Sequence, residues 1–255
     1  MILTVSLMTS CQGSDTPPET TPSQSNPSSS DDKPTSGLRY QSVGDGTYGV
    51  SIGDATSVEH IVIPSTYGDK PVTQILQGGF KDATSLKSIK IPDSVTFIGL
   101  GAFSGCTSLE SVNIPTGIIR IENSTFRNCD SLKTIVIPEG VTVIGALVFE
   151  GSGLESISLP ESLTVIGTKA FYACVKLESI VIPGKVKRID ESAFSSCVKL
   201  KSVILPDSLQ EIGRSLFNDC YELEHVNYAG STDQFNQIDG YKFIGIKVKF
   251  NYVPE

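Results

Sequence analysis

The feature that most constrains this chain is a repeat of 22 or 23 residues. A clear copy reads Leu-Lys-Ser-Ile-Lys-Ile-Pro over residues 86–92, and Val95, Ile98, Phe103 and Cys106 follow it at fixed distances. The copies recur around seven phenylalanines, at Phe80, Phe103, Phe126, Phe149, Phe171, Phe194 and Phe217. Repeats this regular predict a solenoid, because each copy forms one coil and buries its apolar face only by stacking on the next coil.

Each copy contains the run Leu-x-x-Ile-x-Ile, in which apolar and polar residues alternate. Alternation of period two predicts a β-strand with apolar side chains in the core and polar side chains in solvent. We expect eight strands, at residues 58–63, 86–91, 109–114, 132–137, 154–159, 177–182, 200–205 and 223–228. Side by side they would form one parallel sheet along about eight coils.

The opposite side of each coil is predicted to be a turn. A proline after the strand, such as Pro92, has no N–H to donate and ends the ladder. An Ile then returns to the core, and the Gly that usually follows, such as Gly213, indicates a positive φ angle. The next pair, as in Ala102-Phe103, predicts a short helical or 3-10 turn whose ring stacks on that of the next coil. The predicted fold class is an α/β solenoid: a right-handed coil with one sheet face, helical or 3-10 turns opposite, and β-rich caps.

Five cysteines occupy one position of the repeat, three residues after the phenylalanine: Cys106, Cys129, Cys174, Cys197 and Cys220. No C-x-x-C motif occurs among them, although metal or redox chemistry would need a local cluster. Ala83 and Ser152 fill the same position in two further copies, so a buried column of small residues explains the pattern. We therefore predict free thiols and no metal site; disulfides between neighbouring coils are the alternative.

Composition excludes several classes of function. The net charge of −8 and the pI near 4.9 argue against a nucleic-acid partner, because phosphate binding needs clustered Lys and Arg. The two histidines, His60 and His225, belong to the first and last predicted strands and cannot share a catalytic site. The stretch Gly44–Gly49 matches G-x-G-x-x-G but opens no helix, so we interpret it as a hairpin turn. We predict neither catalytic residues nor a cofactor.

The N-terminus differs in composition from the repeats. Residues 1–11 are apolar, then small, and end at Cys11, so they resemble the end of a bacterial lipoprotein signal peptide with Cys11 as the lipidated residue. No Lys or Arg precedes the apolar run, and an uncleaved, frayed end is the alternative. Residues 12–37 are mostly Ser, Thr, Pro, Gly and acidic residues, which predicts a disordered tether because almost nothing there can be buried.

The repeat closely resembles the BspA-like branch of bacterial leucine-rich-repeat proteins, whose units read like C-x-x-L-x-x-I-x-I-P-x-x-V-x-x-I-G-x-x-A-F. The resemblance covers about residues 55–226. It implies a β-hairpin cap over residues 38–57, a solenoid over 58–228 and a capping element over 229–255. It also implies display on the bacterial cell surface or outer envelope, with adhesion or host-protein binding known for some members.

The solvent side of the predicted sheet carries the residues that vary. Its second strand position alternates in charge, as in Glu59 and Lys87, and this predicts pairing between neighbouring strands. Its fifth position departs from the polar pattern at Val136, Val181 and Ile204, and carries Lys90 and Asn113 in two other coils. We hypothesise that these five residues face a ligand. The alternative is that Val and Ile occur there only because they suit a strand.

These observations favour a lipid-anchored cell-surface binding protein that recognises a protein or glycan through the exposed sheet face. We expect a monomer that meets the membrane only through its lipid. The alternative is a structural or spacer role without a specific soluble ligand.

Overall fold

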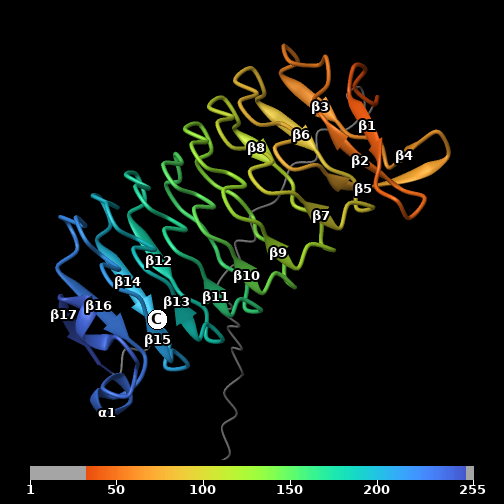
Figure 1. The fold of residues 1–255 in the computed structure, drawn as a ribbon. Coiled ribbons are helices and arrows are strands. Elements are labelled where there is room, and N and C mark those ends of the chain that lie inside the picture. The colour runs from red at the N-terminus through yellow and green to blue at the C-terminus, as the bar shows by residue number, and fades with distance from the viewer. Residues whose placement is uncertain (1–32, 251–255) are drawn as a thin grey trace, which may run out of the picture. The chain divides into compact units, whose positions relative to one another are not determined.

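The computed structural model describes residues 33–250, which wind into about nine turns of a β-solenoid (Figure 1). The solenoid predicted from the repeat is thus confirmed. Cys11 lies outside the described residues, as do residues 12–32 of the predicted tether. At the start of the described chain, Thr35 N donates to Val62 O (3.0 Å), and Val62 N donates to Thr35 Oγ1 (2.8 Å).

The strands of the first sheet lie inside the predicted runs but are shorter. They are β3 (His60–Val62), β6 (Ser88–Lys90), β8 (Ser111–Val112), β12 (Ser179–Val181), β14 (Ser202–Leu205) and β16 (His225–Tyr228). They pair in parallel as β3-β6-β8 and as β12-β14-β16, and β17 (Lys247–Lys249) extends the second group. In the coils between, a single bridge joins Val136 to Ser158.

A second parallel sheet runs along the coils, and the prediction of a single sheet face was incomplete. Its strands are β7 (Phe97–Ile98), β9 (Arg120–Ile121), β10 (Val143–Ile144), β11 (Val165–Ile166), β13 (Arg188–Ile189) and β15 (Glu211–Ile212). The last five form one sheet, and β7 pairs with β5 (Lys70–Ile75). Strands β7, β9, β10, β11, β13 and β15 have two residues each, which is too few for an alternating pattern. The sequence therefore showed only an Ile returning to the core at these places.

Non-repeating elements close the two ends. At the N-terminal end, β1 (Arg39–Ser42) and β2 (Tyr48–Ser51) form an antiparallel hairpin, and β4 (Thr66–Tyr67) pairs with β5. At the C-terminal end lie α1 (Thr232–Phe235), the 3-10 helix η1 (Tyr241–Ile244) and β17. Ser231 caps α1, because its side chain accepts from Gln234 N and the Gln234 side chain accepts from Ser231 N.

The turns that carry the phenylalanines are not helical within the described repeats, contrary to the prediction. The residues two before and two after the ring have positive φ, as Ser192 (56°) and Ser196 (62°) do around Phe194, and this interrupts any helix. Gly213, in contrast, does not have positive φ. A Cβ on Gly213 would lie 2.2 Å from Glu191 N on the preceding coil, so this glycine allows two backbones to approach closely.

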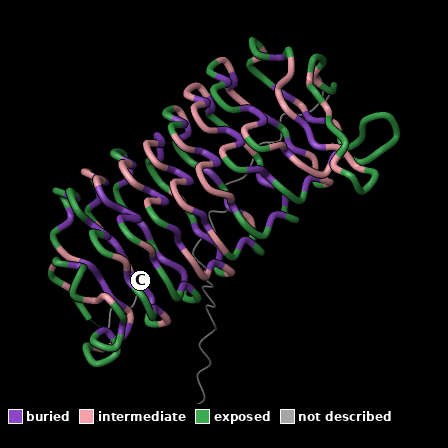
Figure 2. The backbone as a smooth tube through the Cα atoms, viewed as in Figure 1, coloured by how far each residue is buried: buried purple, intermediate pink, exposed green. Residues whose placement is uncertain are grey.

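The core is a stack of aligned columns, and it runs along the inside of the coils (Figure 2). Successive phenylalanine rings from Phe80 to Phe217 stack with centroids 5.2 to 5.9 Å apart, which confirms the predicted stacking. The five cysteines are buried free thiols beside this stack. Each thiol donates to the carbonyl oxygen of the phenylalanine one coil earlier, as Cys197 does to Phe171 at 3.1 Å.

Candidate binding surface

The structure aligns the predicted ligand-facing residues in one row on the solvent side of the first sheet. Val181 on β12 lies directly beside Ile204 on β14, and Asn227 follows on β16. Val136 belongs to the same row two coils earlier, where it pairs with Ser158. The side chains of Val136 and Val181 are 65% and 55% exposed, whereas Ile204 is half-buried. Two of the three apolar residues are therefore largely open to solvent.

Asn113 occupies the same row but uses its amide within the protein. Its Nδ2 donates to Ile91 O at 2.7 Å, and its Oδ1 accepts from Ile91 N at 2.8 Å. The side chain thus takes the place of a strand ladder between two neighbouring coils. Although Asn113 is exposed, both ends of its amide are occupied by backbone groups.

Lys90 is exposed on β6, in register with Val62 on β3. With Pro34, Val62 and Pro92 it lines a shallow cleft of about 410 Å³ at the N-terminal end of the sheet. Lys90 thus belongs to the same row as the apolar residues, but it lies two coils before Val136 and five coils before Ile204.

The charged row pairs across neighbouring coils, as its alternating signs predicted. Lys87 Nζ lies 2.8 Å from Glu59 Oε2, and Lys201 Nζ lies 3.1 Å from Glu178 Oε2. The hydrogen bond from Lys87 lowers the pKa of Glu59, and the same bond raises the pKa of Lys87. Because these side chains are exposed to solvent, the pairs contribute to charge complementarity between coils more than to stability.

The described residues offer little reactive chemistry. Burial raises the pKa of the Cys106 thiol to about 12 and that of Cys220 to about 11, so both thiols stay protonated and weakly nucleophilic at neutral pH. Among residues 33–250, no three His, Cys, Asp or Glu side chains gather where they could hold a metal ion. Within the same range, no helix is long and apolar enough to cross a membrane.

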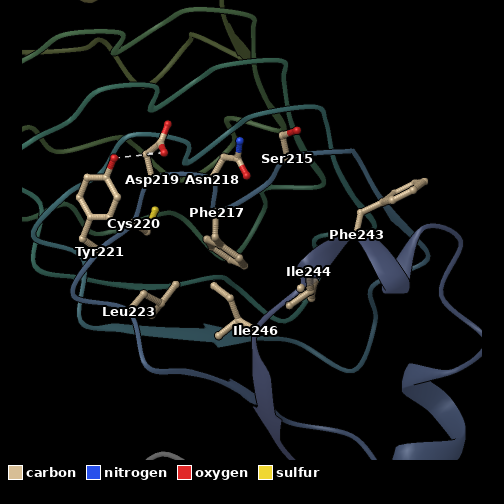
Figure 3. A pocket seen from close by; sticks show the side chains of 11 residues that line it. Ser215, Phe217, Asn218, Asp219, Cys220, Tyr221, Leu223, Phe243, Ile244 and Ile246 are labelled. Atoms are coloured by element: carbon tan, nitrogen blue, oxygen red, sulfur yellow. Dashed lines mark hydrogen bonds between the residues drawn. The ribbon is translucent and has the colours of Figure 1, made fainter.

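A second cleft, which the sequence did not indicate, lies at the C-terminal end of the solenoid. It has a volume of about 300 Å³ and separates the last repeat turn, residues 215–221, from residues 243–246 of the cap (Figure 3). Phe217, Leu223 and Ile246 point toward one another across it. Tyr221 is 78% exposed at its rim, and its hydroxyl donates to Asp219 Oδ1 at 3.2 Å. The cap that completes this cleft does not repeat, so the period gave no signal for it.

Comparison with known proteins agrees with the repeat and the fold. The family profile described as BspA type leucine rich repeat region matches the chain in six copies, over residues 53–178 and 164–252. A solved leucine-rich repeat protein from T. pallidum is 27% identical, with a TM-score of 0.70 over 87% of this chain and 100% of that one. Another, from Bacteroides ovatus, is 26% identical, with a TM-score of 0.53 over 77% of this chain and 71% of that one. No curated protein matches the chain.

Proposed function

This chain belongs to the BspA-type leucine-rich repeat family, and we propose that it is a bacterial cell-surface binding protein with a protein or glycan ligand. The ligand would meet the solvent side of the first sheet, and adhesion is the process that such binding would serve. The proposal is of binding rather than catalysis, because the exposed rows hold paired charges, small hydroxyls and a few apolar side chains.

The observation that carries this proposal is the exposure of Val136 and Val181 on an otherwise polar sheet face. Between the first and last strands, the neighbouring row at the third strand position is made of small hydroxyl residues, among them Ser179 and Ser202, which leave the apolar side chains accessible. Large β-branched side chains in such a setting gain free energy when a partner removes them from water. The row continues through the half-buried Ile204, so the apolar surface spans two adjacent strands.

Changing Val136, Val181 and Ile204 together to Ser tests this surface. We expect the variant to lose affinity for the ligands that the unchanged full chain captures from host-protein and glycan arrays. Ile119→Ser is the matched control, because Ile119 is 69% exposed beside the second sheet and lies outside the proposed surface. Unaltered affinity of the triple variant, with an unchanged circular dichroism spectrum, would remove the sheet face from the proposal. Absence of any captured ligand would favour the spacer role.

We also propose that Cys11 carries a lipid and that the Ser/Thr/Pro-rich residues after it hold the solenoid away from the membrane. Support comes from the apolar residues before Cys11 and from the composition of residues 12–37. Mass spectrometry of the mature N-terminus tests this directly. A first residue Cys11 that carries acyl chains is the expected result, and an unmodified Cys11 would contradict it.

A further inference from the structure

Each repeat has a corner between its phenylalanine turn and the strand that follows, where two consecutive residues reach the surface. This corner pair comes directly after the buried Cys, Ala or Ser of the turn. In the first three corners the pair is polar and carries no positive charge: Thr84-Ser85, Thr107-Ser108 and Asp130-Ser131. In the last three the pair is Val175-Lys176, Val198-Lys199 and Tyr221-Glu222. The corner therefore departs from its polar pattern only in the C-terminal coils.

Backbone hydrogen bonds between neighbouring coils hold the last three corners in line. On the turn side of the corner, Ser196 N donates to Asn218 O at 2.7 Å, and on the strand side Lys201 N donates to Glu178 O at 2.8 Å. Because the coils are in register, equivalent residues lie one coil spacing, about 4.8 Å, apart. The corner pairs thus form two columns, one of Val175, Val198 and Tyr221 and one of Lys176, Lys199 and Glu222.

The first of these columns is apolar and exposed. Val175 is 44% exposed and Tyr221 is 78% exposed, with the half-buried Val198 between them. The Tyr221 hydroxyl donates to Asp219 Oδ1 at 3.2 Å, and this bond holds the ring in a defined orientation (Figure 3). Apolar side chains on three adjacent coils gain free energy when a partner removes them from water, and Tyr is enriched where proteins bind one another.

The apolar column begins beside a step in the surface. The preceding coil is one residue shorter, and Gly153 alone takes the place of its corner pair. Gly153 is buried, and a Cβ on it would collide with Asp130 O on the coil before. The shorter coil is thus drawn in against its neighbour and has no corner side chain. Val175 is therefore open on the side that faces this coil, as well as from above.

The second column adds positive charge beside the apolar one. Lys176 and Lys199 are exposed neighbours of like sign, and neither makes an ion pair within residues 33–250. The carboxylates of Glu178 and Glu222 both lie on Lys201, at 3.1 and 3.9 Å. Two ammonium groups on adjacent coils repel each other, and an anion placed between them replaces that repulsion with attraction. The charge of this column therefore points to an acidic ligand.

We infer that these residues form a second binding surface, the corner strip, which takes an acidic segment of a partner protein. The corner strip consists of Val175, Lys176, Val198, Lys199 and Tyr221. Apolar side chains of the segment cover the apolar column, and its carboxylates meet the two lysines. A glycan fits less well, because a sugar ring laid on the two valines would leave its hydroxyls without hydrogen-bond partners.

The corner strip is separate from the surface proposed on the sheet face. None of its residues belongs to the row of Val136, Val181 and Ile204, whose side chains project from the sheet itself. Loss of binding at one surface therefore leaves the other surface intact, and the two proposals are tested independently.

NMR titration of the full chain with a synthetic acidic peptide tests the inference. The probe is acetyl-Leu-Glu-Leu-Glu-Phe-Glu-amide, and its control has Lys in place of each Glu. We expect saturable shifts centred on Val175, Val198 and Tyr221 with the acidic probe and none with its control. Binding should weaken when the salt concentration is raised to about 0.5 M, because exposed charges are then screened.

Exposed substitutions then separate the corner strip from general charge. Lys176→Glu combined with Lys199→Glu should weaken binding about tenfold or more, and so should Tyr221→Ala. The matched control combines Lys185→Glu with Lys187→Glu, which makes the same change in net charge at two exposed lysines outside the strip. The Ser variant of the sheet-face row should bind the peptide as the unchanged chain does. Circular dichroism shows whether each variant remains folded.

Four outcomes would overturn the inference. They are no saturable binding up to about 1 mM peptide, shifts centred elsewhere on the solenoid, equal weakening by the two double lysine variants, and binding of an acidic oligogalacturonate at the corner strip in place of the peptide. The last result would assign the strip to a glycan.

Discussion

Cys106 Sγ donates a hydrogen bond to the carbonyl oxygen of Phe80, 3.0 Å away on the preceding coil. The thiol is thus a structural donor that ties two coils together, and its burial raises its pKa to about 12 from an ordinary value of 9.0. Both the bond and the raised pKa favour the protonated thiol, because a thiolate at this position could not donate the hydrogen bond and would be poorly solvated.

Stability should therefore fall at alkaline pH. Above pH 9 this thiol ionises in the unfolded chain but stays protonated in the folded chain up to about pH 12. The folded state then binds more protons, so the free energy of unfolding decreases by up to about 1.4 kcal/mol per pH unit for each such thiol. Urea unfolding at pH 8 and pH 10.5 measures the loss, and Cys106→Ala should show a shallower decline. Equal declines in both proteins would contradict the assignment.

The phenylalanine stack should contribute strongly to stability. Phe171→Ala removes a fully buried ring between Phe149 and Phe194, and we expect the free energy of unfolding to drop by about 3–5 kcal/mol. Phe97→Ala is the matched control, because that ring is 44% exposed; its effect should be within about 1 kcal/mol. Denaturant titrations of the two variants measure both losses. Similar losses in free energy of unfolding would mean that a stacked ring contributes no more to stability than the half-exposed ring of Phe97.

Two glycines should respond in opposite ways to the same substitution. Gly213→Ala places a Cβ 2.2 Å from Glu191 N and 2.5 Å from Asp190 C, both backbone atoms. We expect a loss of about 1–3 kcal/mol, because the coils must separate. Gly184→Ala meets no atom within 4 Å and should be neutral or stabilising by up to about 1 kcal/mol. Thermal unfolding of both variants decides the point, and a tolerated alanine at Gly213 would show that coil spacing is adjustable.

Sequence patterns predicted those parts of the fold that repeat with side-chain chemistry. The rings around Phe103 and the thiols around Cys106 recur with one period, and only a stacked core explains apolar residues at that spacing. The second sheet was missed because a strand such as β10 contributes only Val143 and Ile144. We predicted positive φ angles at glycines such as Gly213, but in the structure residues other than glycine, such as Lys169, adopt them.

The candidate surfaces were predictable only in part, because the repeat pattern describes side chains within one coil and not the contacts between coils or the path of the caps. Strand alternation placed Val181 beside Ile204 on the solvent face, and the structure keeps them adjacent. It could not show that Asn113 uses its amide on a neighbouring backbone, because that depends on the offset between coils. Nor could it show the C-terminal cleft, which depends on the path of η1 rather than on any motif.

Asn113 provides a test that separates structure from recognition. Asn113→Ala removes the acceptor for Ile91 N and the donor for Ile91 O, so the free energy of unfolding should fall by about 1–3 kcal/mol. Val136→Ala, in the same row one coil later, removes exposed methyl groups and should cost less than about 0.5 kcal/mol. Urea unfolding measures both, and ligand affinity is then compared at a temperature where both are folded. Loss of affinity in Asn113→Ala without loss of stability would return Asn113 to the ligand-facing set, whereas the reverse pattern assigns it to holding the coils in register.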